Sequence, residues 1–379
     1  MEGIHLEHNQ EFQDCVLVAD WTVIPASQVT QQRPFPHTAQ ATLVLPVSSE
    51  LLYFLSRGPL SRGSISFVVG EESSDVVDVR VEVSYTSPDV LHLMKVCLLQ
   101  RDEVNNGVGI YTSPELENSA SGSGAVFSIQ VKFPAPSSSN APTQVEGLVA
   151  IMPLFGFDIA DIAPRVNFRS CSLQTSNNKV EAKSLYADSG EITTSNGPIE
   201  GTFIGSDSLE LLTSNGAINV NIRLANADAD KATKLSLHSS NGPVTSHLSL
   251  ISTLQGSTGG SFKVTAKTSN GALNVLYSAA PLGSVLQFEG STSNAPAHAA
   301  LPATYEGDFY LSSRGFFSPS ISRNNALQDP AGLGRQRSVQ ISNGMLGTTE
   351  GRVRWGPESE SRLSSVELTT SNGPLSFSL

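Results

Sequence analysis

The chain is poor in charged residues, aromatic residues and cysteine, and each shortage narrows what the protein can be. Charged residues make up 15% and aromatic residues 7% of its 379 residues. Its three cysteines, Cys15, Cys97 and Cys171, lie far apart and form no Cys-x-x-Cys pair. This number and spacing give neither a complete disulfide framework nor a zinc site. We therefore expect three buried or half-buried free thiols.

Positive charge is also scarce, because the formal net charge is −12 and the pI is near 5.0. A protein that binds nucleic acid needs a basic face that neutralises phosphates. The densest basic group lies in residues 335–362, where Glu350, Glu358 and Glu360 offset the arginines. We therefore expect no nucleic-acid partner. That basic group is Arg335, Arg337, Arg352, Arg354 and Arg362.

No long hydrophobic run is present. The most apolar stretch, residues 147–163, contains Pro153, Asp158 and Asp161, so it cannot span a bilayer. The first eight residues have neither the basic n-region nor the apolar h-region of a signal peptide. We therefore expect no transmembrane segment, and an intracellular location unless an N-terminal leader is missing from the sequence.

A short phrase, Thr-Ser-Asn-Gly followed by Pro or Ala and an aliphatic residue, recurs with variations through the second half of the chain. The copy at 239 begins with Ser, and the copy at 341 begins with Ile and has Met after Gly. Weaker copies begin at Thr175 and Thr292, and Ser313-Arg-Gly stands where another copy is due. Asn and Gly tolerate positive φ, so each copy predicts a tight change of direction. The predicted structural corners are Asn196, Gly197, Asn215, Gly216, Asn241, Gly242, Asn270, Gly271, Asn343, Gly344, Asn372 and Gly373.

Alternating apolar and polar residues flank these corners, as in strands with one buried face. Antiparallel hairpins and the coils of a β-solenoid could both use such corners. In a two-residue hairpin the fourth turn residue donates its N–H back to the first. Pro198, Pro243 and Pro374 stand at that position and have no N–H. The prolines therefore favour a β-solenoid, in which stacked corner amides can form a hydrogen-bonded ladder.

The spacing of the corners agrees, because successive Asn residues lie 19 to 29 positions apart with one gap of 49. We predict an all-β fold: a β-solenoid-like stack of irregular coils with Ser-Asn-Gly corners. The expected parts are a lead-in over residues 1–38, a degenerate β-rich part over 39–165 and the regular repeats over 166–379. The alternative is a β-sandwich N-terminal domain followed by an antiparallel β-meander.

The end of the chain raises a separate question, because the last corner lies close to Leu379 and no cap is visible after it. A solenoid needs a cover for its final coil. Either the charged segment 351–362 folds over that end, or the C-terminal coil pairs with another molecule. Self-association through the C-terminal coil is therefore one expected partner interaction.

Candidate metal sites are weak. Asn226-Ala-Asp-Ala-Asp230 opens like an EF-hand loop, but Lys231 and Leu237 replace the required Gly and Glu. His238 and His247 flank the Asn241 corner without a third ligand. We therefore expect no metal and no cofactor.

Candidate catalytic residues are also weak. Many β-helix proteins act on polysaccharides with paired carboxylates. Asp158 and Asp161 form one such pair, and Asp188, Glu191 and Glu200 lie near one corner. Their number does not exceed chance, so we expect no catalytic residue.

Arg314-Gly-Phe-Phe317 and Trp355 are the aromatic features that could form a binding platform in the repeat half. Structural positions explain them as well. Phe316 and Phe317 would stack in the core, and Trp355 would lie at the edge of an insertion.

The Ser-Asn-Gly-[Pro/Ala]-[Ile/Val/Leu] repeats resemble the "putative adhesin" family of domains of unknown function, found in bacterial surface proteins and in uncharacterised fungal proteins. The resemblance is firm over residues 166–379 and weaker over 40–165. It implies a right-handed β-solenoid and no catalytic residues. It also implies an adhesin-like role in which flat Ser/Thr/Asn-rich faces engage a protein or a glycan. A polysaccharide-acting β-helix enzyme and an intracellular scaffold are the alternatives.

Overall fold

The computed structural model describes residues 12–28, 33–118, 124–138, 141–314, 318–324, 326–344, 347–357 and 364–379. The chain forms two compact units, Met1–Tyr186 (unit 1) and Ala187–Leu379 (unit 2). The division falls inside strand β13 (Val180–Thr194), later than the boundary at residue 165 expected from the repeats.

Unit 1 contains two parallel stacks, one formed by the first strand of each coil and one by the second. The coil of β4 and β5 lies between the other coils although it comes first in the chain, so the stacking order differs from the sequence order. The first stack runs β8 (Asn105–Thr112), β4 (Leu51–Arg57), β10 (Thr143–Ile151) and β12 (Val166–Gln174). The second runs β9 (Ala125–Phe133), β5 (Gly63–Val69), β11 (Phe155–Asp161) and the start of β13.

Antiparallel strands cover one end of these coils. Strand β6 (Val76–Tyr85) pairs with β9 and with β3 (His37–Pro46), and β2 (Thr22–Ile24) pairs with β3. Strand β7 (Met94–Gln100) pairs with β8 and with β1 (Cys15–Val18). The N-terminal part therefore combines solenoid coils with sandwich-like antiparallel strands. It contains features of both architectures that were predicted as alternatives for it. Its short helices are η1 (Ala26–Gln28), α1 (Pro88–Leu91) and α2 (Glu115–Asn118).

The expectation of three free thiols is wrong for two of them. Cys15 and Cys97 form a disulfide, with Cα atoms 5.4 Å apart. The antiparallel pairing of β1 with β7 brings together two residues separated by 82 positions in the chain. Cys171 remains free, and its burial raises the pKa of its thiol to about 12.

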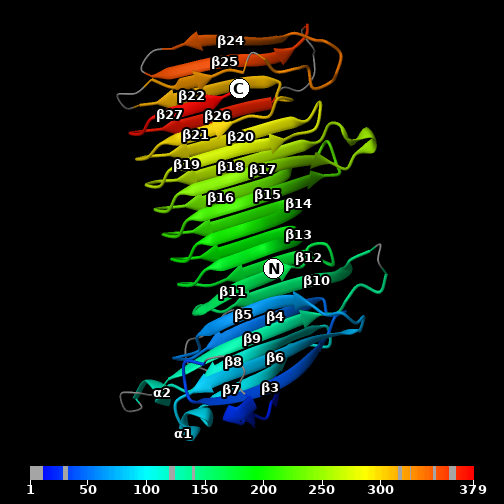
Figure 1. Ribbon diagram of the computed structural model, residues 1–379, viewed down its shortest axis with the longest axis vertical. Coiled ribbons are helices and arrows are strands. Elements are labelled where there is room, and N and C mark those ends of the chain that lie inside the picture. Colours follow the sequence, from blue (N-terminus) through cyan, green and yellow to red (C-terminus); the bar gives the residue numbers. More distant parts are fainter. Residues whose placement is uncertain are drawn as a thin grey trace. The chain divides into compact units, whose positions relative to one another are not determined.

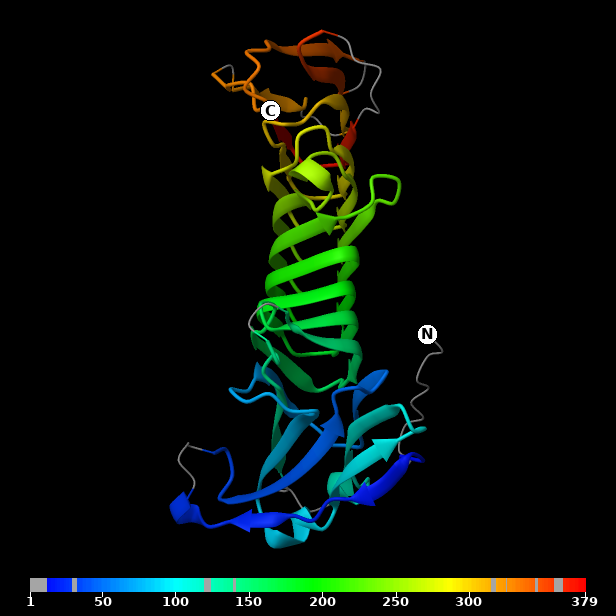
Figure 2. The ribbon, with the colours of Figure 1, turned by 90° about the vertical axis from the view of Figure 1, so that its right-hand side faces the viewer.

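In unit 2 the coils stack to form two layers of parallel strands, as predicted from the prolines at the corners (Figures 1 and 2). Strand β14 (Ile199–Thr213) belongs to both layers, because its first part pairs with β15 and its second with β16. One layer continues β15 (Ile218–Asn226), β17 (Val244–Ser252), β19 (Leu273–Ala279), β21 (Ala297–Ala300), β27 (Leu375–Ser378) and β23 (Ser320–Ser322). The other runs β16 (Thr233–Ser239), β18 (Ser261–Thr268), β20 (Val285–Thr292), β26 (Ser364–Thr370) and β22 (Gly307–Ser313), and η2 (Gln255–Ser257) follows β17.

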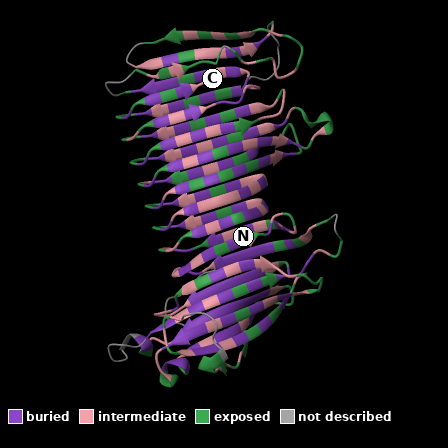
Figure 3. Ribbon diagram, in the orientation of Figure 1, coloured by how far each residue is buried: buried purple, intermediate pink, exposed green. Residues whose placement is uncertain are grey.

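The all-β solenoid prediction is therefore confirmed, whereas the right-handed winding remains a prediction. Burial alternates along the strands in both units (Figure 3). In β15, for example, Ile218, Val220, Ile222 and Leu224 are each at most 2% exposed. These side chains fill the narrow space between the two layers.

The last coil of the sequence is not the last coil of the stack. Strand β26 pairs with β20 on one edge and β22 on the other, and β27 likewise lies between β21 and β23. The C-terminal coil thus has neighbours on both sides, so β26 and β27 offer no free edge for pairing with another molecule. Self-association through this coil remains a prediction.

A hairpin of two antiparallel strands closes that end of the stack. Strand β25 (Thr348–Trp355) pairs with β22, and β24 (Arg337–Asn343) pairs with β25. The expectation that residues 351–362 cover the C-terminal coil is wrong for the residues in β25, because they pair with β22, which lies between them and β26. Residues 358–362 lie outside the described part of the chain.

Candidate functional site

Each repeated corner is held by the hydroxyl of its first residue. At the second corner, the Thr213 hydroxyl accepts the N–H of Gly216 at 3.0 Å and donates to the carbonyl of Gly197 in the neighbouring coil at 3.3 Å. The hydroxyl is buried, and it satisfies backbone groups both within its own corner and in the next coil. The same pair of bonds recurs at Ser239, Thr268 and Thr370.

The corner glycines are required by a close approach of backbones, which corrects the expected role of positive φ. Gly216, Gly242, Gly271 and Gly373 are absent from the positive-φ residues of the described chain. A Cβ added to them would lie only 1.8 to 2.1 Å from the corner carbonyl oxygen of the adjacent coil. A Cβ at these four positions would therefore require the corner backbone to shift. The Asn294 corner has Ala295 at the glycine position and still bonds to the next coil, through the Thr292 hydroxyl and the Asn294 amide.

The corner asparagines form a ladder along unit 2. Asn215 Nδ2 donates to Asn196 Oδ1 at 2.6 Å, and each later asparagine donates to the one in the preceding coil. The last rung joins residues 78 positions apart, since the C-terminal coil lies next to the coil of β20 and β21. The further rungs are Asn241 to Asn215, Asn270 to Asn241, Asn294 to Asn270 and Asn372 to Asn294, at 2.6 to 2.7 Å.

The corner expected at Asn343 and Gly344 is wrong. Asn343 lies opposite Thr349 in an antiparallel pair, and the Gly344 N–H donates to the Thr348 carbonyl at 3.0 Å. This copy is therefore a hairpin between β24 and β25. The sequence carries the reason, because Ile341 stands where the solenoid corners have a Thr or Ser hydroxyl.

Ser313 shows the converse case. The phrase Ser313-Arg-Gly lacks the asparagine, yet the Ser313 hydroxyl donates to the Gly373 carbonyl at 3.2 Å, as at a true corner. The first residue of the phrase is thus a better guide to a solenoid corner than the Asn-Gly pair.

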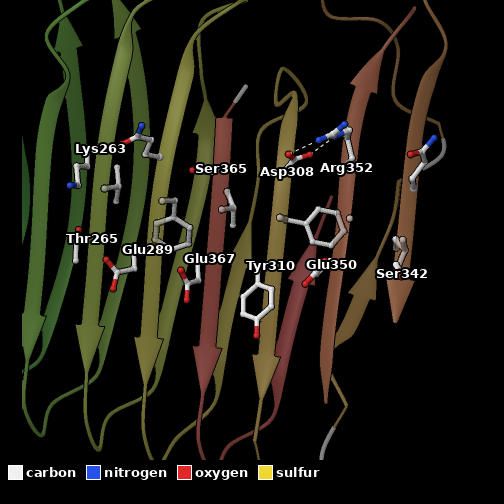
Figure 4. Close-up of a pocket in the computed structure, with 18 residues that line it drawn as sticks. Lys263, Thr265, Glu289, Asp308, Tyr310, Ser342, Glu350, Arg352, Ser365 and Glu367 are labelled. Atoms are coloured by element: carbon white, nitrogen blue, oxygen red, sulfur yellow. Dashed lines mark hydrogen bonds and ion pairs between the residues drawn. The ribbon is translucent and has the colours of Figure 1, made fainter. Parts of the chain in front are cut away.

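A shallow groove of about 730 Å³ lies on the outer face of unit 2, across β18, β20, β26, β22, β25 and β24 (Figure 4). Its polar side chains form two rows that follow the strand register. The first row is Lys263, Gln287, Ser365, Asp308, Arg352 and Gln340. The second row is Thr265, Glu289, Glu367, Tyr310, Glu350 and Ser342.

Some of these charges already have partners. Arg352 donates from Nε and Nη2 to the two carboxylate oxygens of Asp308, with the Nη2–Oδ2 distance at 2.7 Å. This hydrogen bonding holds the Asp308 pKa below its ordinary value. Glu289 forms an ion pair with Lys267 at 2.5 Å. These two pairs fix side chains at opposite ends of the groove.

Three groove charges have no partner within the described chain. Lys263, Glu350 and Glu367 make no ion pair or side-chain hydrogen bond there. Glu350 and Glu367 flank Tyr310 on the neighbouring strands, and Tyr310 is 36% exposed. The centre of the groove is therefore an accessible aromatic ring between two free carboxylates (Figure 4).

No motif in the sequence pointed to this groove. Glu289, Tyr310 and Glu367 are distant in the chain, and only the insertion of β26 between β20 and β22 places Glu367 beside the other two. The remaining signal was weak: each of these residues follows a buried apolar residue in a strand, so each faces outward. That pattern is common to every strand of the solenoid.

The structure does not bring the histidine candidates together. His238 lies on β16 and His247 on β17, in different layers of unit 2, and both are exposed. No group of three or more potential metal ligands occurs among the described residues.

The loop that resembled an EF-hand opening has a structural use. The Asn226 amide is buried, donating to the Lys231 carbonyl at 2.8 Å and accepting the Ser261 N–H at 3.2 Å. Asp228 accepts the Asp230 N–H at 2.9 Å. The loop oxygens are thus used to shape the turn.

The carboxylates singled out from the sequence lie outside the groove. Asp158 and Asp161 are exposed on β11, and Asp161 accepts a hydrogen bond from the Ser184 hydroxyl. Asp188 accepts a hydrogen bond from the Ser206 hydroxyl at 2.6 Å. The other two are Glu191, which is exposed, and Glu200, which is half-buried.

The aromatic candidates do not form a platform either. Trp355 is only 3% exposed and donates its indole N–H to the Ala303 carbonyl at 2.9 Å, so it is a structural residue. Arg314 follows β22 and is exposed, whereas residues 315–317 lie outside the described part of the chain.

The comparisons with known proteins do not identify the chain. No protein-family model matches the sequence, and no curated protein matches it significantly. One solved structure, described as a putative cell adhesion protein from Clostridium sporogenes, aligns over 90% of this chain and 99% of its own, at 7% identity and a TM-score of 0.19. Within the described residues, no helix is long and apolar enough to cross a membrane.

Proposed function

We propose that the protein is a non-catalytic, adhesin-like binding protein whose unit 2 groove holds a glycan. The carrying observation is the exposed Tyr310 ring between the free carboxylates of Glu350 and Glu367. An aromatic ring offers a surface for the apolar face of a sugar, and neighbouring carboxylates accept hydrogen bonds from hydroxyl groups.

The rest of the groove supports a polyhydroxylated ligand. Gln287 and Gln340 supply amides that both donate and accept, and Thr265, Ser342 and Ser365 supply hydroxyls. The groove is shallow and crosses six strands, so it suits an extended chain more than a small enclosed molecule. The Cys15–Cys97 disulfide supports a location in an oxidising compartment outside the cytosol, where the protein would encounter extracellular glycans.

Replacing Tyr310 by alanine is expected to weaken glycan binding by about tenfold, because ring stacking contributes about 1 kcal/mol or more. Affinity electrophoresis in gels that contain soluble polysaccharides would measure the loss. Tyr277→Phe is the control, since Tyr277 is only 6% exposed and lies outside the groove. Unchanged retardation of the Tyr310→Ala variant on every polysaccharide that retards the native protein would contradict the proposal.

A polysaccharide-cleaving enzyme is the second candidate, and one observation favours it. Glu289 and Glu367 lie on adjacent strands, and Glu367 and Glu350 lie two strands apart. At a strand spacing of about 4.8 Å, these intervals are about 5 and 10 Å between backbones. They fall near the carboxylate separations of retaining and inverting glycosidases.

The isosteric changes Glu367→Gln and Glu350→Gln separate the two candidates. A binding protein would release no reducing sugar in either form, and these variants would alter only its affinity. An enzyme would lose at least a hundredfold in turnover while still retaining its polysaccharide in the gel. Release of reducing ends by the native protein, lost in both variants, would replace the first proposal by the second.

A further inference from the structure

Strand β24 is the outermost strand of its layer in unit 2 (Figure 1). One edge pairs with β25, and no strand of the described chain pairs with the other. Such an edge presents unpaired backbone N–H and C=O groups that another strand can bind.

The hydrogen-bond pattern shows which backbone groups face this edge. The Gly344 N–H donates to Thr348 and the Gly356 N–H donates to Gln336, both at 3.0 Å, so even-numbered residues bond to β25. Bonding alternates along an antiparallel pair, and the odd-numbered residues therefore point their N–H and C=O groups outward. These outward residues are Arg337, Val339, Ile341 and Asn343.

We propose that two copies of the protein pair through β24, antiparallel and centred on Gln340. This register places Val339 opposite the partner's Ile341, so apolar side chains meet on one face. On the other face Ser338 lies opposite the partner's Ser342. The single charge of the strand, Arg337, lies opposite the partner's Asn343, and no like charges face each other. The strand is thus self-complementary, as a two-fold interface requires.

Strand β24 has few of the features that protect sheet edges. Its seven residues include no proline or lysine, and its one charged residue, Arg337, is the first of the strand, with its guanidinium over the Trp355 ring. The edge strands of unit 1 differ, because β1 has four residues and β2 has three. One pair of strands is a small interface, so we expect a dimer with a dissociation constant of roughly 10 to 1,000 μM.

The pairing has a consequence for the groove. Gln340 and Ser342 line it at the β24 end. The two-fold axis runs perpendicular to the sheet at Gln340, so both copies present their grooves on the same side. The two grooves join across the axis into one longer surface. The dimer itself does not depend on what the groove binds.

Sedimentation equilibrium of the full chain, at concentrations from about 5 to 500 μM, tests the proposal. The native protein is expected to change from monomer to dimer over this range. Ile341→Pro removes one outward N–H and leaves the bonds to β25 in place, so it is expected to remain monomeric. A native protein that stays monomeric throughout would overturn the inference, as would a dimer that survives the proline.

Disulfide cross-linking is a second test, and it does not depend on whether the proline variant folds. A residue on the axis of a non-hydrogen-bonded pair lies about 4.5 Å from its own copy, between Cα atoms, within the reach of a disulfide. Gln340→Cys is expected to oxidise to a covalent dimer. Ser338→Cys is the matched control, because it faces the partner's Ser342 and should remain uncross-linked. Equal cross-linking of the two variants would exclude this register.

Discussion

Replacing Gly242 by alanine is expected to lower the free energy of unfolding by about 3 kcal/mol. The new Cβ would lie 1.8 Å from the Gly216 carbonyl oxygen, a backbone atom that cannot move without disturbing the adjacent ladder. The Ser239 hydroxyl donates to that same carbonyl at 3.0 Å, so separating the coils would also break this buried bond. Urea denaturation followed by circular dichroism would measure the loss.

Two variants control this experiment. Gly205→Ala places its Cβ at an ordinary 3.4 Å from Leu209, so it should change stability by less than about 0.5 kcal/mol. Asn241→Ala removes two exposed amide bonds beside the same corner and should cost about 1 kcal/mol. If Gly242→Ala were no worse than Gly205→Ala, the close approach of the corners would not be what requires glycine.

Replacing Phe377 by alanine, two residues from Leu379, is expected to lower the free energy of unfolding by about 3 to 5 kcal/mol. Phe377 is fully buried in β27, and its ring packs against Phe309 with centroids 5.1 Å apart. A residue this near the end of a terminal coil would ordinarily fray, and truncating it would have little effect. The cost is large here because β27 is paired on both edges.

Thermal unfolding of Phe377→Ala beside Ser365→Ala would check this expectation. Ser365 is exposed on β26 in the same coil, so its variant should melt within about 2 °C of the native protein. A melting temperature for Phe377→Ala as close to the native value would mean that the C-terminal coil lies at a free end.

The repeats revealed most of the architecture of unit 2 from sequence. Pro198, Pro243 and Pro374 excluded hairpins at their corners, and the spacing of the asparagines predicted a ladder between stacked coils. The physical reason for glycine did not follow, because the sequence cannot show how near the neighbouring backbone comes. The sequence also contains the difference between the hairpin at Asn343 and the solenoid corner at Ser313. Ser313 has the hydroxyl that a solenoid corner buries and Ile341 does not, although only the phrase at Ile341 includes Asn-Gly.

The groove and the disulfide lay beyond sequence reasoning, for a common cause. Both depend on which strands become neighbours, and neighbours in this fold are not always consecutive. Glu367 lies beside Tyr310 only because β26 lies between β20 and β22, which both precede it in the sequence. Cys15 lies beside Cys97 only because β1 pairs with β7. Periodicity fixes which face a residue occupies, but not which strand lies beside it.

The position of β26 and β27 also sets the order of events during synthesis. A ribosome delivers β22 and the β24–β25 hairpin before the strands that separate them from β20 and β21 exist. Until residues 364–378 are synthesised, β22 can pair only with β20 in this layer. Either β22 and the β24–β25 hairpin remain unpaired with the stack, or β22 pairs with β20 early and must separate again so that β26 can insert. Completion of this end of the molecule therefore follows the synthesis of residues 364–378, and its rate will depend on how stable any earlier contact between β20 and β22 is.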